Sequence, residues 1–447
     1  MLSLRKDKKT QMSRILYTSF ILFTLSSMIC AGDTRSNKRP LRAVFSDLRI
    51  HQTDYAGPGR EKSPPINVTE VLIGYFGPCT ASDPEGGDMW RAASLAVEQA
   101  NQAGGYNGLP FRLVAGWSDN PWGSGVTEVI RMAYVHKVWA VIGGIDGPST
   151  HLAEQVVAKA RLTLLSPAST DKTVNLANVP WMFSCLPGDH LQAPILARAI
   201  ASDIKDSPFL LVSAVDHDSH LFTVELTRSF IRHRLMPLHH FEFKPGQKKY
   251  DELVEKIVHT EVESLVLIAA AQESAKLIRA IREKGFKGSI FGGPDMGCRS
   301  FLKQAAAAAE GVIFPLLYTP SKYSESFEEK FIRRFGDSPD YLAAHTYDAM
   351  NLLIAAIHKA GLNRARICDA VRALSGFQGV TGPIQWDPLG SNCRTTSLGT
   401  IRKGRVRTLR RRNHPAYSET AFEPPSVSVR SRLAAIFSKT SMPPPIQ

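Results

Sequence analysis

The sequence lacks the short motifs by which many enzymes and metalloproteins are recognised. It has no C-x-x-C pair, no G-x-x-x-x-G-K-[ST] phosphate loop, no G-x-S-x-G nucleophile elbow and no H-E-x-x-H zinc motif. Its six cysteines are widely spaced, without the spacing of a metal site. Nothing in the sequence places a nucleophile beside a general base. We therefore expect no catalytic activity, no metal and no cofactor.

Long apolar runs are also scarce. The single candidate lies near the N-terminus, where a basic stretch precedes an apolar segment from Ile15 to Ile29 that is followed by small residues. A bilayer-spanning helix needs about 20 apolar residues, so we interpret residues 1–32 as a signal peptide rather than an uncleaved anchor. Ile29 stands where a lipobox requires a small residue, so we expect no lipid anchor at Cys30. We expect the exported protein in the periplasm or at the cell surface.

A basic surface is missing from the central part of the chain. Of the formal net charge of +13, residues 1–66 carry +7 and residues 402–447 carry +8, which leaves −2 for residues 67–401. A folded nucleic-acid-binding surface would be basic, so we expect no nucleic-acid partner. Residues 33–66 are basic and rich in Pro and Gly, as in a mobile linker. Residues 404–447 are basic and rich in Pro, and we expect a disordered tail there.

Between these ends, short apolar runs alternate with amphipathic helical patterns. Strands that alternate with helices indicate a mostly parallel sheet covered on both faces. The alternation of strands and helices begins again after Pro187, so we predict an α/β fold of two doubly wound parallel-sheet lobes. The predicted strands are 71–76, 109–115, 139–142, 162–165, 209–215, 266–270, 289–291 and 311–316, and the predicted helices are 88–103, 127–136, 150–161, 192–203, 222–234 and 273–284.

Two loops of the first predicted lobe are suited to an anion. Ligands of open α/β sheets bind beyond the carboxyl ends of the strands. Gly143–Thr150 follows one such strand and Ser166–Thr170 follows the next, and both loops offer small residues, hydroxyl groups and free N–H groups. Each could instead be an ordinary turn with a Ser or Thr cap. Their occurrence at neighbouring strand ends favours a carboxylate site.

Acidic and histidine residues follow two strands of the second predicted lobe. Asp295 comes after strand 289–291 and could pair with an ammonium group or cap a helix. Asp216, His217, Asp218 and His220 lie close together after strand 209–215. On an exposed loop such a cluster is more often polar surface than a metal site.

Several short segments also occur in a characteristic order between Val71 and Gly404. Together they resemble the type I periplasmic binding proteins, specifically the branched-chain amino-acid type that serves ABC transporters. The segments are Ile73-Gly74 with Gly77-Pro78, Ala100-Asn101 with Gly104–Pro110, Val141–Gly143, Ser166–Thr170, Pro187–Asp189 with Gln192-Ala193, Phe327 with Phe335-Gly336 and Pro339, Tyr347–Ala349, Ala360-Gly361, and Gly376-Phe377 with Gly379–Gly382.

The resemblance implies a Venus-flytrap fold whose two lobes are joined by three hinge crossings. We expect the crossings near Pro187–Gly188, Leu317–Thr319 and Asn392–Thr395. Lobe 1 would comprise 67–187 and 318–393, and lobe 2 would comprise 188–317 and 394–403.

The resemblance also implies the residues that hold the ligand. Family members hold the ligand's α-carboxylate with backbone amides and hydroxyl groups of lobe 1 and its ammonium with an acid of lobe 2. Asp146 stands where a cysteine of a family disulfide is common, and the solute is left open between amino acids, amides and urea-like compounds. The ligand-binding residues implied here are Gly147, Ser149, Ala168 and Thr170 on lobe 1, and Phe222, Gln272 and Asp295 on lobe 2.

We therefore predict a solute-binding protein of an ABC importer. It would close about its hinge on an amino acid or similar amine or amide, and the closed form would dock on a membrane permease. We expect a monomer or weak dimer. The alternatives are a ligand-sensing receptor module of the same fold with a signalling partner, an enzyme, and a partner protein that has lost ligand binding.

Overall fold

The computed structural model describes residues 55–205 and 207–409. The predicted signal peptide, Cys30 and most of the predicted tail lie outside these residues. An N-terminal unit ends at Pro58, and within its described part the Tyr55 hydroxyl donates to the Pro58 carbonyl at 3.0 Å. The remaining described residues belong to the second unit, which begins at Gly59.

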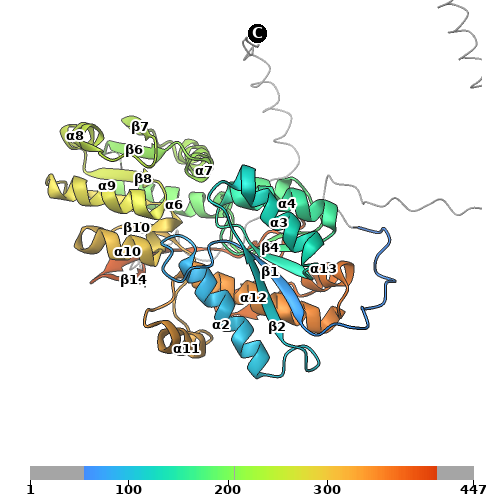
Figure 1. Ribbon diagram of the computed structural model, residues 1–447. Helices are drawn as coiled ribbons and strands as arrows, with labels where there is room; N and C mark the ends of the chain where they lie inside the picture. The colour runs from blue at the N-terminus through green and yellow to red at the C-terminus, as the bar shows by residue number, and fades with distance from the viewer. Residues whose placement is uncertain (1–54, 206, 410–447) are drawn as a thin grey trace, which may run out of the picture. The chain divides into compact units, whose positions relative to one another are not determined.

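The first sheet is parallel and has five strands in the order β2-β1-β3-β4-β5. Figure 1 labels β1, β2 and β4 of this sheet. Strands β3 and β4 are buried along their whole length, as expected for parallel strands with helices on both faces. We call the part of the chain around this sheet lobe 1. Its strands are β1 (Val71–Phe76), β2 (Phe111–Gly116), β3 (Ala140–Gly143), β4 (Thr163–Ser166) and β5 (Met182–Ser184), and its helices are α2 (Gly87–Gln102), η1 (Pro121–Gly125), α3 (Val126–Ile130), η2 (Arg131–Val135), α4 (Gly147–Ala160), α5 (Thr173–Leu176), α11 (Glu325–Phe335), α12 (Tyr341–Ala360) and α13 (Arg364–Ala373).

The second sheet has seven strands in the order β14-β13-β10-β9-β8-β6-β7. Strands β6 to β10 are parallel, and β13 and β14 are antiparallel to their neighbours. We call this part lobe 2. Its strands are β6 (Phe209–Ala214), β7 (His239–Phe243), β8 (Ser264–Ile268), β9 (Ser289–Gly292), β10 (Ile313–Leu316), β13 (Ser397–Arg402) and β14 (Arg405–Thr408), and its helices are α6 (Asp189–Ile204), α7 (His217–His233), α8 (Asp251–His259), α9 (Ala271–Glu283), η3 (Pro294–Gly297), α10 (Arg299–Ala305) and η4 (Ala306–Ala309).

The chain passes from one sheet to the other after β5, after β10 and before β13. After β10 it returns to lobe 1, where α12 packs on α2 and α13 packs on β4. A small hairpin of β11 (Phe377–Gly379) and β12 (Gly382–Ile384) precedes the last passage. The predicted α/β class with two parallel-sheet lobes is confirmed. Within the described residues, no helix combines the length and apolar character needed to cross a bilayer.

Several helices begin earlier than the sequence predicts, and two of these differences affect the site. Helix α4 begins at Gly147 because Asp146 caps it, its Oδ1 accepting the Ser149 N–H at 2.8 Å. Helix α7 begins at His217 because Asp216 caps it in the same way, accepting the Ser219 N–H at 3.0 Å. The cluster from Asp216 to His220 is therefore the first turn of a helix, not the exposed loop that the sequence suggested.

The ends of the folded part also differ from prediction. The tail was expected to begin at 404, but β14 pairs with β13 through residues 405–408. Lys403 and Gly404 both adopt positive φ, 52° and 68°, which is the geometry of a two-residue hairpin turn. In the predicted linker, the Asn363 Nδ2 group donates to the carbonyls of Gly59 and Lys62 at 2.8 and 3.1 Å, which attaches this stretch to the start of α13.

Candidate functional site

A cleft of about 650 Å³ is lined by residues of both lobes. Its volume lies in the range of small-molecule sites. Five of the seven predicted ligand residues line it: Ala168 and Thr170 from lobe 1, and Phe222, Gln272 and Asp295 from lobe 2. The other two, Gly147 and Ser149, lie in the first turn of α4, directly after the lining residues Ile145 and Asp146.

Ser149 is engaged within its own loop. Its Oγ accepts hydrogen bonds from the N–H groups of Ile145 and Asp146 at 3.0 and 3.3 Å, and its N–H donates to Asp146. This reciprocal pattern is a capping box, and the Ser149 side chain is fully buried. The structure therefore gives Ser149 a capping role, which is the alternative that the sequence left open.

The N–H group of Gly147 is occupied by a carboxylate of lobe 2. It donates to both oxygens of Asp218, at 3.2 and 3.0 Å. A side chain at position 147 would overlap Asp218 Oδ1, so this approach requires glycine. Burial raises the pKa of Asp218 to about 7, although the Gly147 N–H opposes the rise. The Asp218 carboxylate thus occupies the Gly147 N–H group, which we expected to bind the carboxylate of the ligand.

The loop after β4 keeps N–H groups available. In the described part of the chain, neither the Ala168 N–H nor the Thr170 N–H donates to a protein acceptor. The Thr170 hydroxyl is engaged with Asp189, and the Ser169 N–H donates to Ser166 Oγ at 3.3 Å. Two free donors at the cleft wall make this loop the better anion subsite of lobe 1.

Asp295 lies opposite, in η3 directly after β9. The Tyr341 hydroxyl donates to Asp295 Oδ1 at 2.8 Å. Burial raises the pKa of Asp295 to about 6, against the lowering effect of the Tyr341 hydrogen bond. Asp295 does not cap a helix, because Gly293 and Cys298 hold the N-cap positions of η3 and α10. Within the described residues no ion pair neutralises Asp295, so its carboxylate is suited to a cationic group.

The other two lobe 2 residues differ in their exposure to the cleft. Phe222 is buried in the core between α6 and α7, and only a small part of its side chain faces the cleft. Gln272 lies in the first turn of α9 and is half-buried. They can supply an apolar contact and an amide hydrogen bond, respectively.

An arginine that the sequence analysis missed joins the lobes beside the cleft. Arg299 of α10 donates from Nε and Nη2 to Asp88 of α2, at 2.7 and 2.5 Å, and from Nη1 to Asp337. All three residues line the cleft. Arg299 and Asp88 are 211 positions apart, so no local pattern could have paired them.

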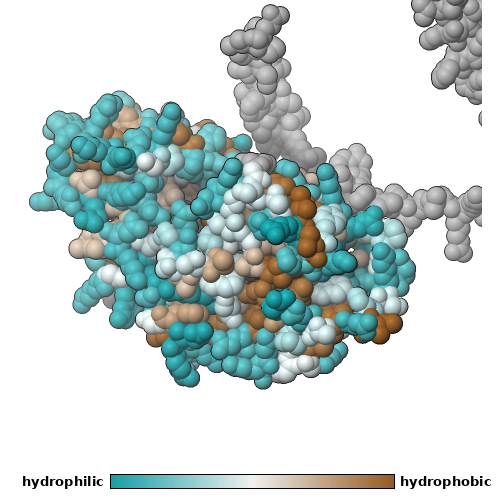
Figure 2. All heavy atoms as spheres, viewed as in Figure 1, coloured by the Kyte–Doolittle hydropathy of each residue, from teal (hydrophilic) through white to brown (hydrophobic). Residues whose placement is uncertain are grey.

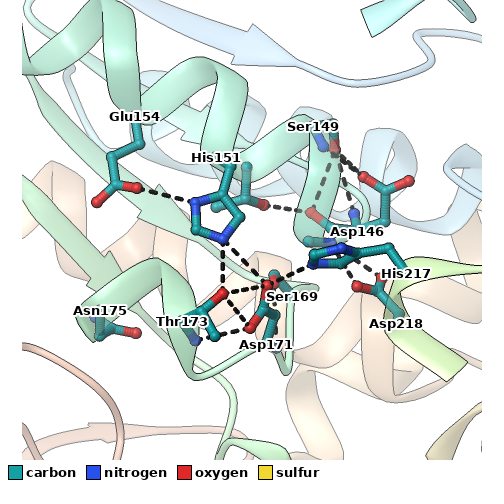
Figure 3. Close-up of polar contacts among 12 residues, drawn as sticks. Asp146, Ser149, His151, Glu154, Ser169, Asp171, Thr173, Asn175, His217 and Asp218 are labelled. Carbon is teal, nitrogen blue, oxygen red and sulfur yellow. Dashed lines mark hydrogen bonds and ion pairs between the residues drawn. The ribbon is translucent and has the colours of Figure 1, made fainter. Parts of the chain in front are cut away.

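Histidines make a second contact between the lobes (Figure 3). His217 of α7 lies 2.9 Å from Asp171 Oδ2, and His151 of α4 lies 3.2 Å from the same atom. Hydrogen bonds with Asp171 and Glu154 raise the pKa of His151 to about 9. Burial alone would raise the pKa of Asp171, but its hydrogen bonds with the two histidines and Thr173 outweigh burial and lower that pKa. Nearby, Lys172 pairs with Glu225 at 2.5 Å.

The sequence profile of the periplasmic binding protein family matches residues 70–402. The chain belongs to the periplasmic binding protein family. Among relatives, the leucine-, isoleucine-, valine-, threonine- and alanine-binding protein of Pseudomonas aeruginosa is 23% identical over 72% of this chain and 86% of its own length. The Leu/Ile/Val-binding protein homolog 1 of Brucella suis is also 23% identical, over 72% of this chain and 87% of its own length.

Solved structures of this family share the fold. The branched-chain amino-acid transporter substrate-binding protein LivJ of Streptococcus pneumoniae, in complex with isoleucine, has a TM-score of 0.70 and 21% identity, covering 75% of this chain and 97% of its own. A solute-binding protein of R. palustris in complex with benzoate has a TM-score of 0.69 and 15% identity, covering 76% and 95%. These structures show that the chain has the predicted fold, and the family that its sequence matches is one of binding proteins. Ligands as different as isoleucine and benzoate occur on that fold, so the fold alone does not identify a solute.

Proposed function

We propose that this periplasmic binding protein is the extracytoplasmic solute-binding component of an ABC importer. Its ligand would be an amino acid or a similar small amine or amide, held between the lobes. The observation that carries the proposal is the pairing of opposite chemistries across one cleft. Lobe 1 offers the free N–H groups of Ala168 and Thr170, and lobe 2 offers the carboxylate of Asp295, without an ion-pair partner in the described residues.

In this arrangement an α-amino acid spans the cleft. Its carboxylate accepts hydrogen bonds from Ala168 and Thr170, and its ammonium group donates to Asp295. The ligand side chain lies toward Phe222, and Gln272 supplies a further polar contact. Gly147 takes part only if Asp218 withdraws from its N–H, and Ser149 contributes indirectly by fixing the α4 cap.

Closure about the three chain passages would couple binding to transport. A ligand that touches both lobes binds the closed form more tightly than the open form, and this difference shifts the protein toward closure. The closed form would then dock on a permease, with the protein as a monomer or weak dimer. We propose that residues 1–32 direct export and that Cys30 carries no lipid.

Isothermal titration of the purified protein with chemically matched solutes tests the proposal. The series contains L-leucine and other L-amino acids, their α-amides, which lack the carboxylate, and their deaminated acids, which lack the ammonium group. We expect that removal of either group from the best ligand raises Kd at least about 10-fold, the equivalent of about 1.4 kcal/mol. Equal affinity for the amino acid, its α-amide and its deaminated acid would contradict an amino-acid site, as would no binding of any solute in the series. Benzoate and urea serve as solutes without the amino-acid pattern.

A further inference from the structure

Three side chains with metal-binding atoms converge where the two lobes touch (Figure 3). His151 projects from α4, Asp171 lies between β4 and α5, and His217 opens α7 on the other lobe. One ligand atom from each lies within 4.8 Å of the other two. Both imidazole Nε2 atoms lie close to Asp171 Oδ2, at 3.2 Å for His151 and 2.9 Å for His217.

Neighbouring residues hold His151 and Asp171 in place through hydrogen bonds and an ion pair, as is common around metal ligands. His151 Nδ1 lies 3.4 Å from Oε2 of the buried Glu154. Asp171 Oδ1 accepts the N–H and the hydroxyl of Thr173, both at 2.7 Å. A carboxylate behind a histidine fixes the tautomer and orients the ring nitrogen toward a metal. The two lobe 1 ligands are thus pre-oriented by buried contacts.

The group offers a cation one carboxylate and two ring nitrogens. When His151 donates its Nδ1 hydrogen to Glu154, the neutral ring presents an Nε2 lone pair to a carboxylate oxygen. That lone pair can accept from the Thr173 hydroxyl, which lies 2.8 Å away, or bind a metal ion. In the described part of the chain, both ion pairs of Asp171 are with these histidines, and the carboxylates of Glu154 and Asp218 lie nearby.

Space at the group is kept open by glycine. A Cβ at Gly147 would lie 2.9 Å from His217 Cδ2 and 3.0 Å from Asp171 Oδ2. Because position 147 has no side chain, His217 of lobe 2 can approach Asp171 of lobe 1. The His217 side chain is 42% exposed, so an ion reaches the group from solvent without unfolding of the protein.

We propose that His151, Asp171 and His217 form a site for a divalent transition-metal ion of the Zn²⁺ type that links lobe 1 to lobe 2. Two imidazoles and one carboxylate are a ligand set that Zn²⁺ accepts, with a fourth position left for water or another small ligand. Binding replaces the proton on each Nε2 that carries one, so protons are released as the ion binds. Because the ligands come from both lobes, the ion favours the arrangement in which the lobes touch. The proposal departs from the sequence-based expectation of no metal.

The test uses purified full-length protein stripped with EDTA and dialysed, titrated calorimetrically with ZnCl₂ alone. We expect one site that is lost in His217→Ala and in His151→Gln. Glu154→Gln should weaken Zn²⁺ about 10- to 100-fold, because it removes only an outer partner. The matched control is His220→Ala, an exposed histidine of the same helix outside the group. It should bind Zn²⁺ like the unaltered protein.

A second readout separates this site from other zinc binding by the chain. Co²⁺ in a tetrahedral site absorbs visible light, and this absorption should be present in the unaltered protein and in His220→Ala but absent in His217→Ala. Circular dichroism checks that each variant is folded. Equal Zn²⁺ affinity of His217→Ala and unaltered protein, or no saturable binding by the folded unaltered protein, would refute the site.

Discussion

Replacement of Asp295 by asparagine should change ligand affinity and stability in opposite directions. Asparagine has nearly the same shape and can still accept the hydrogen bond of Tyr341, so the variant removes the charge and little else. A hydrogen bond to a charged group contributes about 1.5–3 kcal/mol. We therefore expect Asp295→Asn to raise Kd for the best amino-acid ligand about 10- to 100-fold.

The stability of the ligand-free protein should rise instead. The folded-state pKa of Asp295 is raised from 3.8 to about 6, which corresponds to a cost of at most about 3 kcal/mol for keeping it ionised. Between pH 3.8 and about 6 the folded state binds more protons than the unfolded state, so this cost appears as pH rises through that window. Asp295→Asn should therefore be more stable than the unaltered protein at pH 8, and the gain should shrink below pH 6.

Isothermal titration and urea unfolding at pH 5 and pH 8 measure both effects. The control is Asp251→Asn, which alters an exposed aspartate at the start of α8 and should change neither quantity. In the unaltered protein, affinity should fall as pH drops below about 6, because a protonated Asp295 carries no charge. Unchanged affinity in Asp295→Asn would refute the ammonium contact, and a loss of stability at pH 8 would refute the argument from burial.

Three further substitutions test the contacts around the cleft and the core. Gly147→Ala inserts a methyl group against the facing carboxylate, so Tm should fall by the equivalent of about 1–3 kcal/mol and Zn²⁺ affinity should fall with it. Arg299→Met removes the guanidinium that joins Asp88 to Asp337 and leaves Asp88 only its pair with Arg91, so it should cost about 1.5–3 kcal/mol in urea unfolding. Arg279→Met, on an exposed ion pair, should cost less than about 1 kcal/mol. Phe291→Ala empties a fully buried position of β9 and should cost about 3–5 kcal/mol in the same assay.

The surface has a patch that the sequence did not predict. Ile130, Tyr134 and Val135 of α3 and η2 are 41%, 52% and 66% exposed, and apolar surface is visible over this part of lobe 1 in Figure 2. The sequence predicted one regular helix for residues 127–136, but η2 has π-helical turns. In a π-helix the side chains are offset from the 3.6-residue period, so the spacing of apolar residues in the sequence does not locate its buried face.

The sequence by itself determined the class of fold and the position of the loops that we propose to bind an anion. Apolar runs that alternate with amphipathic helices are local patterns, and the carboxyl ends of parallel strands meet at one edge of their sheet. Ala168, Thr170 and Asp295 could therefore be named from strand ends and from family resemblance, and the structure brings them to one cleft. Phe222 and Gln272 rested on the resemblance alone, and both line the same cleft.

Only the tertiary structure decided which polar groups remain available in that cleft. The Asp218 carboxylate reaches Gly147 across 71 positions, and His217 reaches Asp171 across 46. No periodicity or motif encodes such contacts, because they depend on how the two lobes meet. Local patterns assign His217 and Asp218 to a polar loop after β6. In the structure Asp218 accepts the Gly147 N–H, which was a predicted ligand donor, and His217 completes the proposed metal site with His151 and Asp171.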